Sequence, residues 1–217
     1  MPVKEKIHQF KSELPANVEL VAVSKTRPVA ELMKAYEAGQ RIFGENKIVE
    51  MSEKHEQMPA DVKWHMIGHV QTNKVKVMAP FVDLIHGVDS FKLLAEINKH
   101  AVKNNRIVNC LLQVHIANEE TKFGLSNDEL EELLNSVELK ALTNIKVKGL
   151  MGMATFTENE DIIRNEFTLL KSLYNRHSQQ HKMSILSMGM SGDYKIAIEC
   201  GSNMVRIGSS IFGERIY

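Results

Sequence analysis

Short apolar runs rich in β-branched residues alternate with longer amphipathic stretches along the whole chain. The apolar runs have the length and composition of strands, and the longer stretches follow the pattern of helices with one apolar face. The expected strands are 18–24, 41–43, 62–68, 82–88, 107–116, 145–153, 184–190 and 203–208. The expected helices are 2–13, 28–39, 45–57, 71–79, 90–104, 126–139, 158–181 and 193–199.

This alternation predicts parallel strands joined by right-handed helical crossovers. Eight β/α units in 217 residues favour a closed (β/α)₈ barrel, which usually takes about 250 residues. The alternative is a doubly wound open sheet, which usually has fewer strands and a glycine fingerprint after the first one. Here the first strand runs into SKTRP, which contains no glycine. We therefore expect an α/β protein with the fold of a single TIM barrel.

Helix start and stop signals agree with these boundaries. Pro28 begins the helix after the first strand, and Gly39 follows its end. Ser126 is a typical N-cap residue, with acidic residues in the turn that follows it. No tract rich in Pro, Gly and Ser interrupts the chain, so we expect residues 1–217 to form one domain.

Composition narrows the class of protein. Lys and Arg number 27 and so do Asp and Glu, so the totals give no indication of a nucleic-acid partner. No apolar run approaches the roughly 20 residues that span a bilayer, and the N-terminus lacks the apolar segment of a secretory signal. The two cysteines, Cys110 and Cys200, lie in apolar surroundings and are expected to be reduced. We expect a cytoplasmic protein that binds neither membranes nor nucleic acids.

Lys25 stands at the end of the first strand, where barrels of this kind place ligand-binding groups. Side chains alternate along a strand, so Val21, Val23 and Lys25 share one face. If that face is the barrel interior, Lys25 lies above a packed floor and loses hydration, which favours its neutral amine. A neutral amine is what carbonyl chemistry requires. The alternative is an ordinary surface lysine at the start of a loop.

The last two strands end in motifs that suit a phosphate group. SMGMSG (187–192) and RIGSSIFG (206–213) place Ser191, Gly192, Gly208 and Ser209 just beyond strands seven and eight. Phosphates usually bind at these loops in this fold, held by backbone N–H groups and hydroxyls. Each Gly-Ser pair alone would indicate only a turn, but two at this place favour a phosphorylated ligand.

Arg206 and the pair His65 and His69 are further candidates for ligand or metal binding. Arg206 has the inward parity of Gly208, and its partner is expected to be either a ligand acceptor or an acid across the barrel mouth. His65 and His69 are four residues apart but straddle a strand end and Gly68, so they do not form a helical metal pair and no metal site is expected.

Together these segments resemble one family. VAVSKTRP, IFGEN (42–46), WHMIGHVQTNK (64–74), EETKFGL (119–125), GLMGMAT (149–155), LSMGMSGD (186–193) and VRIGSSIFGER (205–215) are similar to the motifs of the pyridoxal phosphate homeostasis proteins. That family resembles the barrel domain of alanine racemase, a pyridoxal 5′-phosphate (PLP) fold of type III. The resemblance covers about residues 18–215, nearly the whole chain.

The resemblance implies a set of cofactor-binding residues. Lys25 would form the Schiff base with PLP, and Arg206 would face the pyridine nitrogen. Lys122 would lie at the rim of the site. Lys47 and His115 depart from the family pattern and leave contacts at the rim open. The residues expected to line the cofactor or hold its phosphate are Asn46, Met190, Ser191, Gly192, Gly208 and Ser209.

The expected function is to carry and buffer PLP as the Lys25 Schiff base for intracellular PLP homeostasis, with apo-forms of PLP-dependent enzymes as recipients. The chain ends at Tyr217, so the second domain that gives racemases a tyrosine base and a dimer is expected to be missing. We therefore expect a monomer with no catalytic residues. The alternatives are a small PLP-dependent amino-acid racemase or lyase, and a PLP-free barrel enzyme acting on a sugar phosphate, which SKTRP and Arg206 fit poorly.

Overall fold

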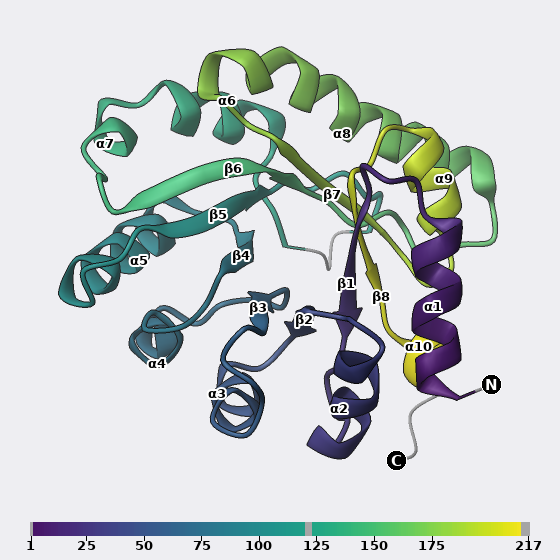
Figure 1. The fold of residues 1–217 in the computed structure, drawn as a ribbon. Helices are drawn as coiled ribbons and strands as arrows, with labels where there is room; N and C mark the ends of the chain where they lie inside the picture. Colours follow the sequence, from purple (N-terminus) through teal and green to yellow (C-terminus); the bar gives the residue numbers. More distant parts are fainter. Residues whose placement is uncertain (1, 120–122, 214–217) are drawn as a thin grey trace.

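The computed structural model describes residues 2–119 and 123–213, and its eight parallel strands close into a barrel in chain order. Figure 1 shows the strands side by side in the middle of the molecule with the helices around them. The barrel closes where β1 pairs with β8, with Val21 opposite Arg206. The strands are β1 (Glu19–Val23), β2 (Ile42–Glu45), β3 (Lys63–Met66), β4 (Leu84–Val88), β5 (Val108–Gln113), β6 (Ile145–Met151), β7 (Ile185–Met190) and β8 (Met204–Ile207).

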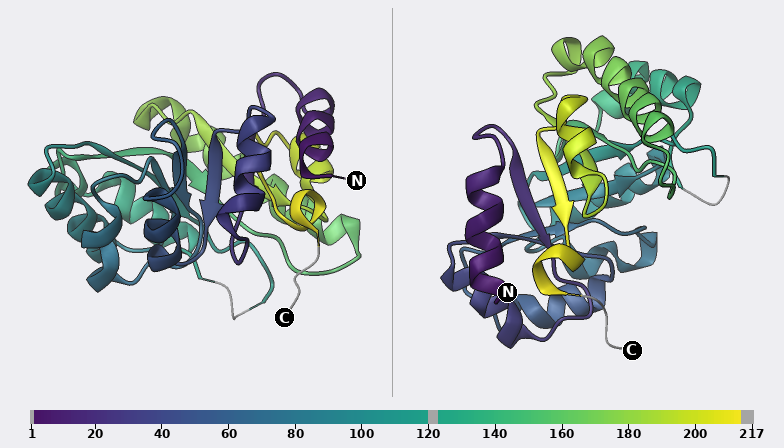
Figure 2. Two further views of the ribbon diagram at one scale, coloured as in Figure 1. Left: turned by 60° about the horizontal axis from the view of Figure 1, so that its bottom comes forward. Right: turned by 90° about the vertical axis from the view of Figure 1, so that its right-hand side faces the viewer.

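Helices follow the strands and cover the outside of the barrel. The helix α1 precedes β1 and packs against α2 and α10, as the right-hand view of Figure 2 illustrates for α10. The helices are α1 (Val3–Glu13), α2 (Val29–Glu37), α3 (Ile48–His55), α4 (Val75–Met78), α5 (Phe91–Lys103), α6 (Asn127–Asn135), α7 (Val137–Lys140), α8 (Glu160–His181), α9 (Tyr194–Glu199) and α10 (Ser209–Phe212), with a 3₁₀ turn at Thr72–Lys74. None of the helices in the described part of the chain combines the length and the apolar character needed to cross a bilayer.

The alternation of side chains along β1 separates two apolar layers. Val21 packs inside the barrel with Leu84, Leu111, Met151 and Met204. Its neighbours Leu20 and Ala22 belong to the larger apolar layer between strands and helices. The predicted parity of the first strand is confirmed, and it directs Val23 and Lys25 to the inner side above Val21.

The barrel prediction is confirmed, while several helix boundaries were wrong. The segment 126–139 is two helices, because Ser136 is extended and its hydroxyl caps a new turn at Leu139. The helix expected from residue 45 begins at Ile48, since Glu45 still belongs to β2. The segment 71–79 begins as a 3₁₀ turn and ends as one turn of α4.

Candidate functional site

A cavity of about 490 Å³ lies at the C-terminal ends of the strands. All eight residues expected to bind a cofactor line this one cavity, although they come from four different strand ends. Lys25 follows β1, Asn46 follows β2, and Arg206 lies within β8. The others lie at the ends of β7 and β8: Met190, Ser191, Gly192, Gly208 and Ser209.

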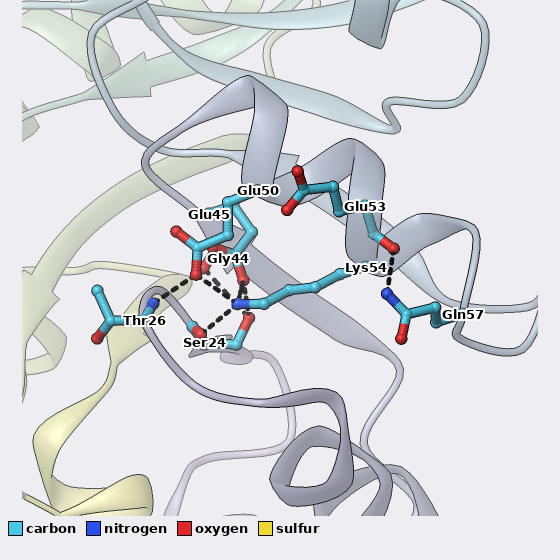
Figure 3. A network of polar contacts seen from close by, with 8 residues as sticks. All are labelled: Ser24, Thr26, Gly44, Glu45, Glu50, Glu53, Lys54 and Gln57. Atoms are coloured by element: carbon cyan, nitrogen blue, oxygen red, sulfur yellow. Dashed lines mark hydrogen bonds and ion pairs between the residues drawn. The ribbon is translucent and has the colours of Figure 1, made fainter.

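The turn that carries Lys25 is held by a buried ammonium group. Lys54 of α3 donates hydrogen bonds to the carbonyl oxygen of Ser24 at 2.7 Å, to Glu45 Oε1 at 2.8 Å and to Glu50 Oε1 at 2.7 Å. Figure 3 shows the lysine reaching from its helix into this group of oxygen atoms. An ammonium has three N–H donors, so all three are used.

The same carboxylates hold the residues on both sides of Lys25. The Ser24 hydroxyl donates to Glu45 Oε1 at 2.6 Å, and the Thr26 backbone N–H donates to Glu50 Oε1 at 2.5 Å. Thr26 has a φ of 64°, in the left-handed region that a non-glycine residue enters at a cost. The hydrogen bond from Thr26 to Glu50 (Figure 3) stabilises this strained turn, and thus the direction of Lys25.

Glu45 shows what this arrangement costs. Its side chain is fully buried at the end of β2, and burial raises the pKa of the carboxyl above its ordinary value. The charge of Lys54 and the hydrogen bonds from Lys54 and Ser24 act in the opposite direction. Glu45 Oε2 has no hydrogen-bond partner among the residues described. A buried ion pair of this kind adds little net stability, but removing one partner is strongly destabilising.

Arg206 lines the cavity and is 4% exposed. Its Nη1 donates to the Ser187 hydroxyl at 2.6 Å and to the Ser187 carbonyl oxygen at 3.0 Å, and its Nη2 donates to the Gly152 carbonyl oxygen at 3.1 Å. Burial lowers the pKa of the guanidinium to about 10, and the charge of Asp193 opposes that shift. The group therefore remains a cation at neutral pH.

The loops after β7 and β8 are joined at the predicted phosphate position. The Gly208 N–H donates to Ser191 Oγ at 3.2 Å. A Cβ at Gly208 would lie 3.2 Å from the Cβ of Val23, whereas a Cβ at Gly192 would meet nothing within 4 Å. The side chain of Val23 therefore packs beneath Gly208, and the space beside Gly192 is open.

Several cavity residues were missed at the sequence level. Asp193 lines the cavity, its Oδ1 accepts a hydrogen bond from the Met190 N–H, and its charge acts on Arg206. The sequence indicated an acid across the barrel mouth as one of two possible partners of Arg206, but it did not single out Asp193. Its position directly after Gly192 was a usable signal, because it belongs to the same strand-end motif. Arg27 also lines the cavity and donates to the Gly213 carbonyl oxygen at 2.6 Å. The other lining residues that we missed are Ile67, Thr155, Phe156, Thr157, Ile163, Phe212 and Gly213.

Other candidate residues lie elsewhere. Lys47 is exposed at the start of α3, outside the cavity lining. His69 stacks on Phe123, and its Nδ1 lies 3.3 Å from Asp89. His65 is 2% exposed inside the barrel. Lys122 lies outside the described residues.

Comparison with known proteins defines the class first. Residues 2–216 match the family model of the alanine racemase N-terminal domain. Alanine racemase from Clostridium difficile, in complex with cycloserine, superposes with a TM-score of 0.83 at 14% identity. This chain is matched in full and covers 60% of the racemase chain. The likeness shows that the fold is the barrel domain of the racemases.

More similar proteins identify the family within that class. The chain is 40% identical over 202 residues to the pyridoxal phosphate homeostasis protein of Aquifex aeolicus, covering 92% of this chain and 88% of the relative. It is 42% identical over 205 residues to the protein of that name from Schizosaccharomyces pombe, covering 92% and 85%. PipY of Synechococcus elongatus, solved with PLP bound, has a TM-score of 0.89 at 32% identity, covering 97% of this chain and 100% of PipY.

The chain belongs to the pyridoxal phosphate homeostasis protein family. The family resemblance drawn from the seven sequence motifs is thereby confirmed.

Replacing Lys54 tests the network around the Lys25 turn. We expect Lys54→Met to lower the free energy of unfolding by about 3 kcal/mol, because it leaves Glu45 buried without its charge partner. Urea denaturation of the full chain measures this. Lys99→Met is the matched control, since Lys99 pairs with Glu96 at the surface, where a salt bridge contributes less than about 1 kcal/mol. Equal losses in the two variants would contradict the role given to Lys54.

Proposed function

We propose that this chain binds PLP in the cavity at the strand ends, holds it as a Schiff base on Lys25 and releases it to apo-forms of PLP-dependent enzymes. The observation that carries the proposal is the convergence of Lys25, Arg206 and the joined Ser191 and Gly208 loops on one cavity. Support comes from the names of the relatives and from PipY, which was solved with PLP bound.

The groups in the cavity fit the three functional parts of PLP. The amine of Lys25 suits the aldehyde, and the guanidinium of Arg206 suits the pyridine nitrogen as a hydrogen-bond donor. Ser191, Gly192, Gly208 and Ser209 would bind the phosphate through hydroxyl and backbone N–H groups. Asn46 and Met190 would contact the ring. Lys25, Arg27 and Arg206 also give the lining an excess of positive charge over Asp193, which suits a phosphorylated ligand.

The charges in the cavity favour a carrier over an enzyme. PLP supplies an electron-accepting ring, which works best when a carboxylate keeps the pyridine nitrogen protonated. Arg206 is a cation in that place and gives up no proton at neutral pH, so it weakens this property. Asp193 is the one carboxylate among the described lining residues, and its Oδ1 is engaged by the Met190 N–H. An amino-acid reaction would also need a base within about 3 Å of the substrate carbon.

The rim of the cavity favours exchange with solvent. Phe156 lines the cavity and is 96% exposed, so this part of the rim lies in water. Water that reaches the link to Lys25 hydrolyses it, which lets PLP leave. The same access disfavours catalysis, because such chemistry needs a site shielded from water. An exchangeable cofactor is what a PLP carrier requires.

Reduction with borohydride tests the covalent link. We expect the loaded protein to lose its visible absorption on reduction and peptide mass mapping to place a pyridoxyl group on the peptide containing Lys25. Lys25→Ala is the control and should carry no such group at that position. Labelling chiefly at Lys47 or Lys122 would show that the assignment is wrong.

Two parallel assays separate a carrier from the alternative, a small PLP-dependent racemase or lyase. We expect the loaded protein to restore activity to a PLP-dependent apo-enzyme and to turn over a panel of amino acids far more slowly than about 1 s⁻¹, an ordinary rate for an enzyme. The Lys25→Ala variant gives the background of each assay. Turnover at about 1 s⁻¹ or faster without transfer would establish the enzyme instead.

We further propose that the chain works as a single-domain monomer in the cytoplasm. The exposed large apolar side chains support a monomer, since they are distributed over α3, α5, α7, α8 and the loops between elements: Val49, Phe91, Val102, Ile107, Phe123, Val137, Phe156 and Leu169. Sedimentation velocity should give one species near the mass of 24.6 kDa at every concentration. A dimer that persists on dilution would contradict this.

A further inference from the structure

A row of polar side chains crosses the interior of the barrel below the cavity. The interior of such a barrel is ordinarily filled by branched aliphatic residues, and here Val21, Leu84 and Leu111 follow that rule. His65 of β3 and His86 of β4 do not, although they are 2% and 0% exposed. Buried polar groups of this kind need partners.

The partners form one continuous chain of contacts. Arg206 Nη1 lies 2.6 Å from Ser187 Oγ, which lies 3.2 Å from His86 Nδ1. His86 Nε2 lies 3.1 Å from His65 Nδ1, and His65 Nε2 lies 3.5 Å from Asp83 Oδ2. Five side chains thus connect the cofactor cavity with the start of β4, at the other end of the barrel.

With both histidine rings neutral, the chemistry of the two ends sets one direction for every hydrogen bond. The guanidinium of Arg206 only donates hydrogen bonds, so Ser187 Oγ accepts one from it. The Ser187 hydroxyl can then donate its own hydrogen bond to His86 Nδ1. The carboxylate of Asp83 only accepts, so His65 Nε2 must carry a proton. A neutral His65 then has a bare Nδ1, which accepts from His86 Nε2–H. Both ends therefore predict the Nε2–H tautomer for both histidines.

Burial is the largest cause that lowers the pKa of His86 well below its ordinary value, and the charge of Arg206 acts in the same direction, so that ring is neutral. The hydrogen bond from His65 lowers the pKa of Asp83, so that its carboxylate is ionised.

The far end of the chain is accessible to water. Asp83 has a side chain that is 44% exposed, and with His65 it borders a cavity of about 70 Å³ at the N-terminal ends of the strands. Other charged residues face this end from several elements: Glu19, Lys63 and Lys148 line the same cavity, and Arg106 acts on Asp83. The row of polar contacts thus joins the buried guanidinium of Arg206 to the solvated carboxylate of Asp83.

We propose that His86, His65 and Asp83 are positioning residues for Arg206: they fix Ser187 as its acceptor and so hold the guanidinium at the cofactor cavity. The effect on PLP binding rests on the function proposed above. The direction of the hydrogen bonds and their effect on the position of Arg206 do not depend on PLP. Cationic His65 would have to donate from Nδ1, which would force His86 into the other tautomer and turn a donor toward Ser187.

Nitrogen NMR of the cofactor-free full-length protein tests the chain without reference to PLP. At pH 7 we expect His65 and His86 to be neutral Nε2–H tautomers and the Arg206 Nη protons to exchange slowly with water. Asp83→Asn removes the charge that fixes the direction while keeping the shape of the side chain, so it should mix the tautomers and speed Arg206 exchange at least threefold. An Nδ1–H or cationic form of either histidine in the wild type, or unchanged exchange in Asp83→Asn, would overturn the proposal.

The matched control is Asp89→Asn. Asp89 pairs with His69 at a similar distance, and neither residue belongs to the row of polar contacts that ends at Arg206. It should leave the Arg206 protons unchanged. Ser187→Ala removes one acceptor of Arg206 from a position outside the cavity lining and should speed exchange further. If Asp89→Asn matched Asp83→Asn, a general loss of structure would explain the effect, and the proposal would be wrong.

PLP titration then measures the consequence at the cavity. We expect PLP to bind about tenfold more weakly to Ser187→Ala and about threefold more weakly to Asp83→Asn, with a shifted absorption of the bound cofactor, and within twofold of wild type to Asp89→Asn. Normal affinity and absorption in the first two variants would overturn the link to the cavity. Failure of the wild type to bind PLP would instead refute the proposed function. The NMR result would still show whether His86, His65 and Asp83 position Arg206.

Discussion

The site depends above all on the buried ammonium of Lys54, which determines the shape of the turn that carries Lys25. Glu45 is fully buried, Thr26 has an unfavourable backbone conformation, and the Ser24 carbonyl oxygen lies at the strand end. Lys54 donates hydrogen bonds to the Ser24 carbonyl oxygen and to Glu45. It also donates to Glu50, which in turn accepts a hydrogen bond from the Thr26 N–H. Since buried ion pairs contribute little to net stability, we interpret this one as defining a geometry: it fixes Lys25 from both sides.

The second buried cation, Arg206, differs from Lys54 in the charge of its hydrogen-bond partners. Lys54 is surrounded by carboxylates, so its charge is compensated within the protein. The η nitrogens of Arg206 are held by a hydroxyl and two carbonyl oxygens, which fix its position without neutralising it. Its charge thus remains available to the contents of the cavity. One cation shapes the protein, and the other faces the cavity.

The sequence predicted the barrel, and it predicted eight of the residues that line the cavity at the strand ends, because both follow local rules. The two-residue period of β1 directs Val21 and Lys25 inward, and parallel strands bring Asn46, Ser191 and Gly208 to one end. What it could not predict depends on contacts between distant residues. The hydrogen bond from Lys54 to the Ser24 carbonyl oxygen spans 30 positions, and the contact of His86 with Ser187 spans 101, so neither leaves a periodic trace in the sequence. The break between α6 and α7 was missed because Ser136 can either continue a helix or cap a new one.

A phosphate site alone would not separate a PLP carrier from a barrel enzyme that acts on a sugar phosphate, because the loops after β7 and β8 serve phosphates in many proteins of this fold. The distinction comes from the other groups in the cavity. A sugar phosphate requires acids and bases for its hydroxyl groups, yet the described lining offers one carboxylate beside three cations. An aromatic aldehyde with a ring nitrogen instead requires one amine and one donor, and Lys25 and Arg206 supply these. Under the proposed function, the same scarcity of carboxylates in the described lining would leave a bound amino acid without a second base, so the cavity that binds PLP would store it and not use it.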